Sequence, residues 1–238
     1  MEELSQFPSL VAPTAHRPLL GLTVLVVEDS RFTCEAMRLL CLRSGARIRR
    51  ADTLAAARRH LRTYRPTVAI LDLGLPDGSG LDLIRDLRRY DHGIKAILAT
   101  SGDDTLAHAA MLAGADGFLS KPLTSVAAFQ QAILKHLPRS HVPTHPRPVS
   151  GEEVNPDALA YHDDLRIAAA HLDGQSDVRR LAYLGRFVSG VARSAGDIDL
   201  QTAAETLLAT QKSSRPNDKS VTRLSDLLKD RLATKQSV

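Results

Sequence analysis

The feature that most constrains the fold is a regular alternation of short apolar runs and amphipathic segments between residues 22 and 137. The apolar runs, such as LTVLVVED and TVAILDL, are rich in β-branched residues, as expected for strands buried on both faces. The segments between them carry apolar residues at helical spacing. Five strand–helix units in succession predict a doubly wound α/β domain with a five-stranded parallel sheet.

The strands of this domain are expected at residues 22–29, 46–52, 67–73, 94–101 and 116–121. The helices are expected at residues 30–45, 53–65, 79–91, 103–115 and 123–137. Ser30 is suited to cap the first helix, and Gly45 is suited to end it. Because a helix follows each strand, the connections cross over and the strands are expected to run parallel.

Polar residues stand at the carboxyl ends of these strands, where open parallel sheets bind ligands. Glu28 and Asp29 end the first strand, and Asp72 ends the third. Thr100 ends the fourth strand and Lys121 the fifth. A lone aspartate at a strand end is usually a turn former, but five polar residues at matching ends indicate a shared site. Clustered carboxylates suit Mg²⁺, and a carboxylate beside two cations can attack phosphorus.

The segments VLVVEDS, AILDLGLPDGSGLDLI, AILATSG and GADGFLSKPL resemble the receiver domain of bacterial two-component response regulators. The resemblance implies a flavodoxin-like fold with Asp72 as the phosphoacceptor. It also implies a Mg²⁺ site formed by Glu28, Asp29, Asp72 and the backbone carbonyl of Gly74. Gly74 and Gly102 carry no side chain, so water is expected to reach the site easily.

The same resemblance assigns roles to three further residues. Lys121 would pair with the phosphoryl oxygens, and Thr100 would hydrogen-bond one of them on activation. Phe118 matches the aromatic switch position, although it lacks the phenolic hydroxyl of the commoner tyrosine. The peptide bond between Lys121 and Pro122 is expected to be cis.

The chain is expected to continue through a linker into a second domain. Residues 138–153 contain four prolines and no apolar periodicity, which predicts an extended linker. We therefore divide the chain into an N-terminal arm (1–20), a receiver domain (21–137), this linker and a helical domain (154–238). Helices are expected near residues 156–173, 176–195, 198–212 and 218–234. Short connections between amphipathic helices predict an antiparallel four-helix bundle.

The segment YLGRFVSGVARSAGDIDLQTAAETLLA resembles the signature region of a histidine phosphotransfer domain. Gly190 and Gly196 stand four and ten residues after the position of the family's histidine, which here is Arg186. Arginine cannot accept a phosphoryl group as imidazole does. We therefore expect a degenerate output or dimerisation domain. A phosphorelay role would need another histidine, such as His162 or His171 on the preceding helix.

Arg179, Arg186 and Arg193 recur every seven residues and so line one face of the second helix of this bundle. One interpretation is a docking face for an acidic surface, such as the active-site edge of a receiver domain, or a kinase. The alternative is a row of solvated arginines opposite the buried stripe.

The charge and the cysteine content narrow the possible partners and the expected location of the protein. The chain has a net charge of +4, but residues 153–238 carry twelve basic and twelve acidic residues. DNA binding depends on neutralising the phosphates of the DNA, so a neutral output domain argues against nucleic acid as the partner. The alternative hypothesis is a DNA-binding transcriptional regulator with an unrecognised output domain. No apolar run is long enough for a membrane span, and the start lacks a secretory leader. On one helix, Cys34 and Cys41 would stand too far apart for a disulfide, which indicates a cytoplasmic protein.

These observations predict a cytoplasmic, non-enzymatic response regulator. Its expected partners are a sensor histidine kinase or phosphotransfer protein and a downstream protein of unknown identity. A homodimer formed through the helical domain is compatible with the pattern.

Overall fold

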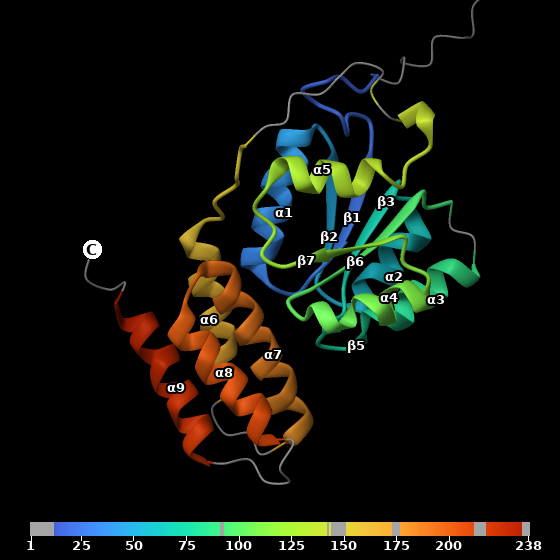
Figure 1. The fold of residues 1–238 in the computed structure, drawn as a ribbon. Coiled ribbons are helices and arrows are strands. Elements are labelled where there is room, and N and C mark those ends of the chain that lie inside the picture. The colour runs from blue at the N-terminus through green and yellow to red at the C-terminus, as the bar shows by residue number, and fades with distance from the viewer. Residues whose placement is uncertain are drawn as a thin grey trace, which may run out of the picture.

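The computed structural model describes residues 12–90, 93–141, 143, 151–172, 177–211 and 218–234. An α/β domain and a helical bundle lie side by side (Figure 1). Within the described residues, we find no helix with the length and apolar character needed to cross a bilayer.

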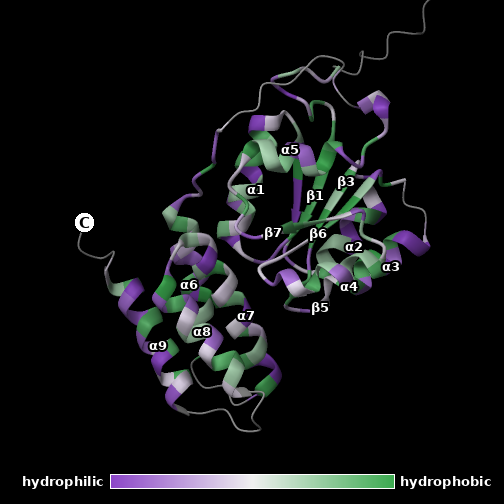
Figure 2. Ribbon diagram, viewed as in Figure 1, coloured by the Kyte–Doolittle hydropathy of each residue, from purple (hydrophilic) through white to green (hydrophobic). Residues whose placement is uncertain are grey.

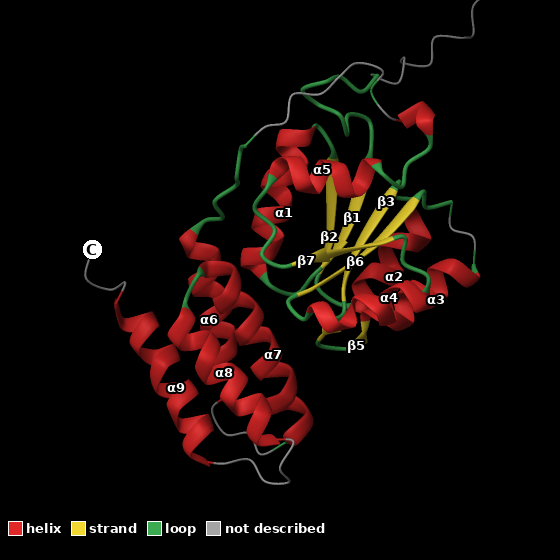
Figure 3. Ribbon diagram, viewed as in Figure 1, coloured by secondary structure: helices red, strands yellow, loops and turns green. Residues whose placement is uncertain are grey.

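The α/β domain is built on one parallel five-stranded sheet with the order β2-β1-β3-β6-β7. These strands are β1 (Thr23–Val27), β2 (Arg47–Ala51), β3 (Val68–Asp72), β6 (Ala96–Ser101) and β7 (Gly117–Ser120). A two-residue hairpin, β4 (Gly74–Leu75) with β5 (Gly78–Ser79), follows β3 and was not predicted. Figure 3 shows the sheet between its covering helices. The predicted flavodoxin-like architecture is confirmed.

Helices cover both faces of this sheet. They are α1 (Arg31–Ser44), α2 (Leu54–Thr63), α3 (Gly80–Arg89), α4 (Ala107–Ala113) and α5 (Val126–Leu134). Helices α1 and α5 pack on one face, and α2, α3 and α4 pack on the other. Figure 2 shows the central strands as the most hydrophobic part of the domain. Every residue of β3 is buried, because side chains of both faces point into a core.

The domain extends beyond the predicted boundaries at both ends. Leu19 is fully buried in the core beneath α1, and its amide donates to the Ser44 carbonyl at 2.9 Å. At the other end, Val154 is buried in the same core, and its amide donates to the Thr124 carbonyl at 2.8 Å. An apolar side chain near the end of the predicted arm and one at the start of the predicted helical domain therefore belong to the core of the sheet domain. Residues 1–11 of the arm lie outside the described residues.

The bundle contains α6 (Ala158–Leu172), α7 (Val178–Ala195), α8 (Ile198–Gln211) and α9 (Asp218–Ala233). Each helix lies within a few residues of its predicted position. Leucine, valine and alanine side chains from all four helices form one core. Gly185 permits the close approach of α7 and α8, because a Cβ atom there would lie 2.8 Å from Leu208 Cδ2.

The bundle is attached to the α/β domain at the N-terminus of α1. The Asp164 carboxylate accepts hydrogen bonds from the Ser30 hydroxyl at 2.8 Å and from the amides of Arg31 at 2.9 Å and Phe32 at 3.0 Å. Asp164 is fully buried. It therefore satisfies amides of α1 that have no partner within the helix. The Phe32 and Tyr161 rings meet edge to face beside it, with 5.7 Å between their centroids.

Candidate functional site

The carboxyl edge of the sheet places Asp72 at the centre of the domain. Asp72 is the last residue of β3, and it pairs in register with Thr100 of β6. The first residue of α3, Gly80, packs directly against the Asp72 backbone, because a Cβ atom there would lie 2.0 Å from the Asp72 carbonyl oxygen. A glycine at this position therefore lets the loop after β3 fold back without displacing Asp72.

Gly80→Ala is expected to destabilise the domain although alanine is the better helix former. The added methyl group would overlap backbone atoms that cannot rotate away, so we expect a loss of about 2–3 kcal/mol in the free energy of unfolding. Urea unfolding measures this loss. Gly151→Ala is the matched control, because a Cβ atom there meets nothing within 4 Å. Equal stability of the two variants would contradict the packing argument.

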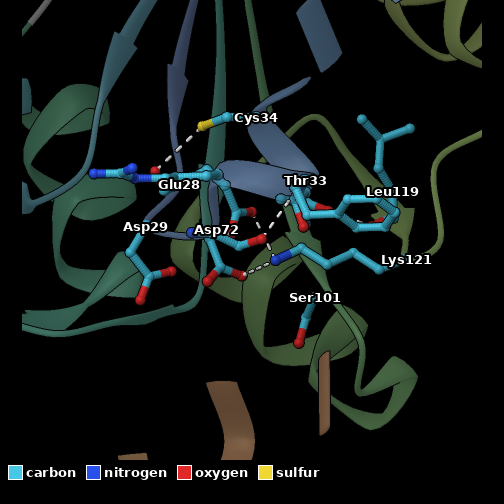
Figure 4. Close-up of polar contacts among 12 residues, drawn as sticks. Glu28, Asp29, Thr33, Cys34, Asp72, Ser101, Leu119 and Lys121 are labelled. Atoms are coloured by element: carbon cyan, nitrogen blue, oxygen red, sulfur yellow. Dashed lines mark hydrogen bonds and ion pairs between the residues drawn. The ribbon is translucent and has the colours of Figure 1, made fainter. Parts of the chain in front are cut away.

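The predicted acidic residues and the predicted lysine meet at this edge (Figure 4). Lys121 Nζ lies 2.6 Å from Glu28 Oε2 and 3.1 Å from Asp72 Oδ1. Glu28, Asp29 and Asp72 each offer an oxygen, and these atoms all lie within 4.8 Å of one another. Glu28 and Asp72 are buried, whereas Asp29 is half-buried. The four side chains therefore form one compact group at the strand ends.

The negative charges of these buried carboxylates are only partly compensated by Lys121. Burial raises the pKa of Glu28 well above its ordinary value, although Lys121 lowers it. Burial, followed by the charge of Asp72, raises the pKa of Asp29 to about 6. Burial would lower the pKa of Lys121, but its attraction to Asp72 and Glu28 outweighs this and raises it. A further cation would relieve the repulsion between the carboxylates.

The donor set fits Mg²⁺. Three carboxylate oxygens converge within one ion's reach, and hard oxygen ligands are the ones that Mg²⁺ prefers. Gly74 lies beside them, since a Cβ atom there would be 3.7 Å from Asp72 Oδ2. The backbone carbonyl of Gly74, which is a predicted ligand of the metal ion, therefore belongs to a residue that lies next to the carboxylates.

Thr100 and Phe118 lie on the neighbouring strands. Thr100 is fully buried, and its hydroxyl donates to the Leu119 carbonyl at 2.8 Å. Phe118 is half-buried against the core beneath α2, α3 and α4. The bond between Lys121 and Pro122 is cis, as expected.

The bundle covers this edge of the sheet. The Tyr183 hydroxyl of α7 donates a hydrogen bond to Asp29 Oδ2, and the Arg193 guanidinium donates one to the Gly102 carbonyl. A Cβ atom at Gly102 would lie 4.0 Å from Gly190 Cα, so α7 lies close to the loop at Gly102. Gly74 and Gly102 nevertheless both line a cavity at this edge, and easy access of water to the site stays a prediction.

A cavity of about 870 Å³ lies between α7 and the acidic group. All three predicted stripe arginines, Arg179, Arg186 and Arg193, line it. The sequence interpretation missed Tyr183, which lies four residues after Arg179 and three before Arg186. Helical spacing places it on the same face as the arginines, and this is the signal that could have identified it.

The fold and the carboxylate–lysine group define a doubly wound α/β domain with an acidic site at the strand ends, and a family match identifies its class. Residues 24–133 match the family described as the response regulator receiver domain. This part of the chain is therefore a response regulator receiver domain. The match ends before the helical bundle.

The chain is also similar to curated proteins that are named as transcriptional regulatory proteins. KdpE, the KDP operon transcriptional regulatory protein of Escherichia coli (strain K12), is 36% identical over 126 residues, covering 53% of this chain and 56% of that protein. PhoP, the virulence transcriptional regulatory protein of Salmonella typhimurium (strain 14028s / SGSC 2262), is 33% identical over 115 residues, covering 47% and 51%. The chain spans about half the length of the curated relatives it matches.

Solved structures also resemble the chain over the same fraction. One is the receiver domain of the sensor histidine kinase PA1611 from Pseudomonas aeruginosa PAO1, with a magnesium ion coordinated in its active site cleft. It is 21% identical with a TM-score of 0.44, covering 48% of this chain and 96% of that one.

Proposed function

We propose that the chain is a two-component response regulator that is phosphorylated on Asp72 in a Mg²⁺-dependent reaction. The observation that carries this proposal is the group at the sheet edge. There, Asp72 lies 3.1 Å from Lys121 and within 4.8 Å of two further carboxylates, beside a cavity. Glu28, Asp29, Asp72 and the Gly74 carbonyl would hold the metal ion.

The chain's own residues supply the nucleophile and a fixed positive charge. A carboxylate oxygen of Asp72 forms the new O–P bond while the donor's N–P bond breaks, and the electron pair of that bond stays on the donor's imidazole nitrogen. Lys121 is held by Glu28 beside Asp72, where its ammonium stabilises the phosphoryl oxygens. A bound Mg²⁺ supplies further charge neutralisation. Thr100 and Phe118 would then change position and alter the surface of the domain.

The donor would be a sensor histidine kinase or a phosphotransfer protein, and the helical bundle would carry the signal through contacts with another protein. The electrical neutrality of residues 153–238 supports a protein partner over nucleic acid. A homodimer through the bundle belongs to the same proposal. The two free, buried cysteines agree with a cytoplasmic location.

Phosphorylation of the purified full chain by a small donor tests this function without a kinase. We expect incubation with phosphoramidate and Mg²⁺ to add one phosphoryl group, measured by intact mass spectrometry. Asp72→Asn is expected to lose the modification, and so is the wild type with EDTA.

Asp82→Asn is the control, because Asp82 is exposed and pairs only with Arg85, at 2.7 Å, among the described residues. Retention of the phosphoryl group in Asp72→Asn would contradict the proposed acceptor.

A transcriptional regulator with an output domain of a different kind is the second candidate, because the curated relatives KdpE and PhoP are both named as transcriptional regulatory proteins. A salt-dependent mobility shift of genomic DNA fragments by the full chain would support it. Absence of a shift at low salt would leave the protein-partner function.

A further inference from the structure

Helix α7 crosses the carboxyl edge of the sheet directly above Asp72. Tyr183 contacts Asp29, which follows β1, and Gly190 lies against Gly102, which follows β6. Strand β3 lies between β1 and β6 in the sheet and ends at Asp72. The segment of α7 between its two contact points, about two helical turns, therefore passes over Asp72, and this segment carries Arg186.

The side of the cavity formed by α7 carries a cation, Arg186, that is not engaged by other described residues. Arg193 is engaged with the Gly102 carbonyl and with Glu205, which lies 3.0 Å away. Arg186 is exposed to the cavity, and its guanidinium makes no ion pair or hydrogen bond with any other residue that the structure describes. Across the cavity, the ammonium of Lys121 is already shared between two carboxylates. A new anion at Asp72 would therefore find an available partner in Arg186.

We infer that Arg186 binds the outer phosphoryl oxygens of phosphorylated Asp72, so that phosphorylation tightens the docking of the bundle. The inference rests on the function proposed above. The acyl phosphate would carry a charge of about −2 in place of the single negative charge of the carboxylate, and it would present three acceptor oxygens. The planar guanidinium matches such oxygens with paired N–H donors. The bundle thus responds to phosphorylation of the receiver in the same chain, because Arg186 forms an oxyanion subsite.

Binding of beryllofluoride in the presence of Mg²⁺ tests this subsite in the full chain. The dissociation constant, measured by isothermal titration calorimetry, is expected to rise about tenfold in Arg186→Gln, because one charge-assisted interaction is lost. Arg180→Gln is the matched control. Arg180 lies on the same helix, is exposed, and hydrogen-bonds His171 at 2.8 Å outside the cavity.

The outcomes separate the two proposals. Weaker binding in Arg186→Gln alone supports the subsite. Equal binding in the wild type and Arg186→Gln, with loss of binding in Asp72→Asn, overturns the subsite and leaves the proposed function standing. Absence of binding in the wild type overturns both.

Hydrogen exchange of the same samples is a second measurement, which shows whether the anion tightens or loosens the docking of the bundle. Addition of beryllofluoride is expected to slow amide exchange in the loop around Gly102, where α7 docks, in the wild type but not in Arg186→Gln. Faster exchange of this loop in the wild type would show that the anion releases the bundle, and would overturn the inference.

Discussion

Lys121→Met is expected to lower the free energy of unfolding of the receiver domain by about 3–5 kcal/mol without Mg²⁺. The ammonium is almost completely buried and lies 2.6 Å from Glu28 and 3.1 Å from Asp72. Its removal leaves buried carboxylates that repel one another with no compensating charge. Urea unfolding followed by circular dichroism measures the loss, and Mg²⁺ is expected to recover part of it by restoring positive charge.

Lys135→Met separates this effect from a general loss of lysine, because Lys135 is exposed at the C-terminal end of α5 and does not line the cavity in the described part of the chain. It is expected to unfold as the wild type does. Lys121→Arg keeps the charge and is expected to lose less stability than Lys121→Met. If Lys121→Met were as stable as the wild type, the carboxylates would not depend on this ammonium.

The receiver site could be predicted from the sequence because each of its residues stands where a strand ends. Parallel strands bring their carboxyl ends to one edge, so the positions of Asp29, Asp72 and Lys121 along the chain already implied their proximity in space. The apolar runs before Asp29 and Asp72 are buried on both faces, which left little freedom in the register. The β4–β5 hairpin lacked such a signal, because it spans only two residues on each strand.

The position of the bundle could not be predicted in the same way. Its contacts with the receiver join residues far apart in the chain, and the seven-residue repeat of arginines on α7 indicated a docking face but left its partner open. A further local signal existed at Asp164, which stands three residues after Tyr161 and four before Ala168, on the apolar face of α6. A carboxylate on a buried face needs hydrogen-bond donors, and the sequence alone did not show that α1 supplies them.

Asp164→Ala is expected to weaken the attachment of the bundle to the receiver by about 2–4 kcal/mol. The substitution leaves the amides of Arg31 and Phe32 and the Ser30 hydroxyl without their acceptor. Amide exchange in the first turn of α1 and along α6 should become faster while both domains stay folded. Asp163→Ala is the control, because Asp163 forms an exposed ion pair with Arg31 at 2.8 Å that is worth less than about 1 kcal/mol.

The same variant connects the attachment to the proposed oxyanion subsite. Asp164 does not line the cavity in the described part of the chain, although Ser30, whose hydroxyl donates to Asp164, does. If Arg186 acts from the docked bundle, Arg186→Gln should weaken binding much less in an Asp164→Ala background than in the wild type. Additive effects would mean that Arg186 reaches the anion without the docking that Asp164 provides, and exchange at α1 would then stay independent of beryllofluoride.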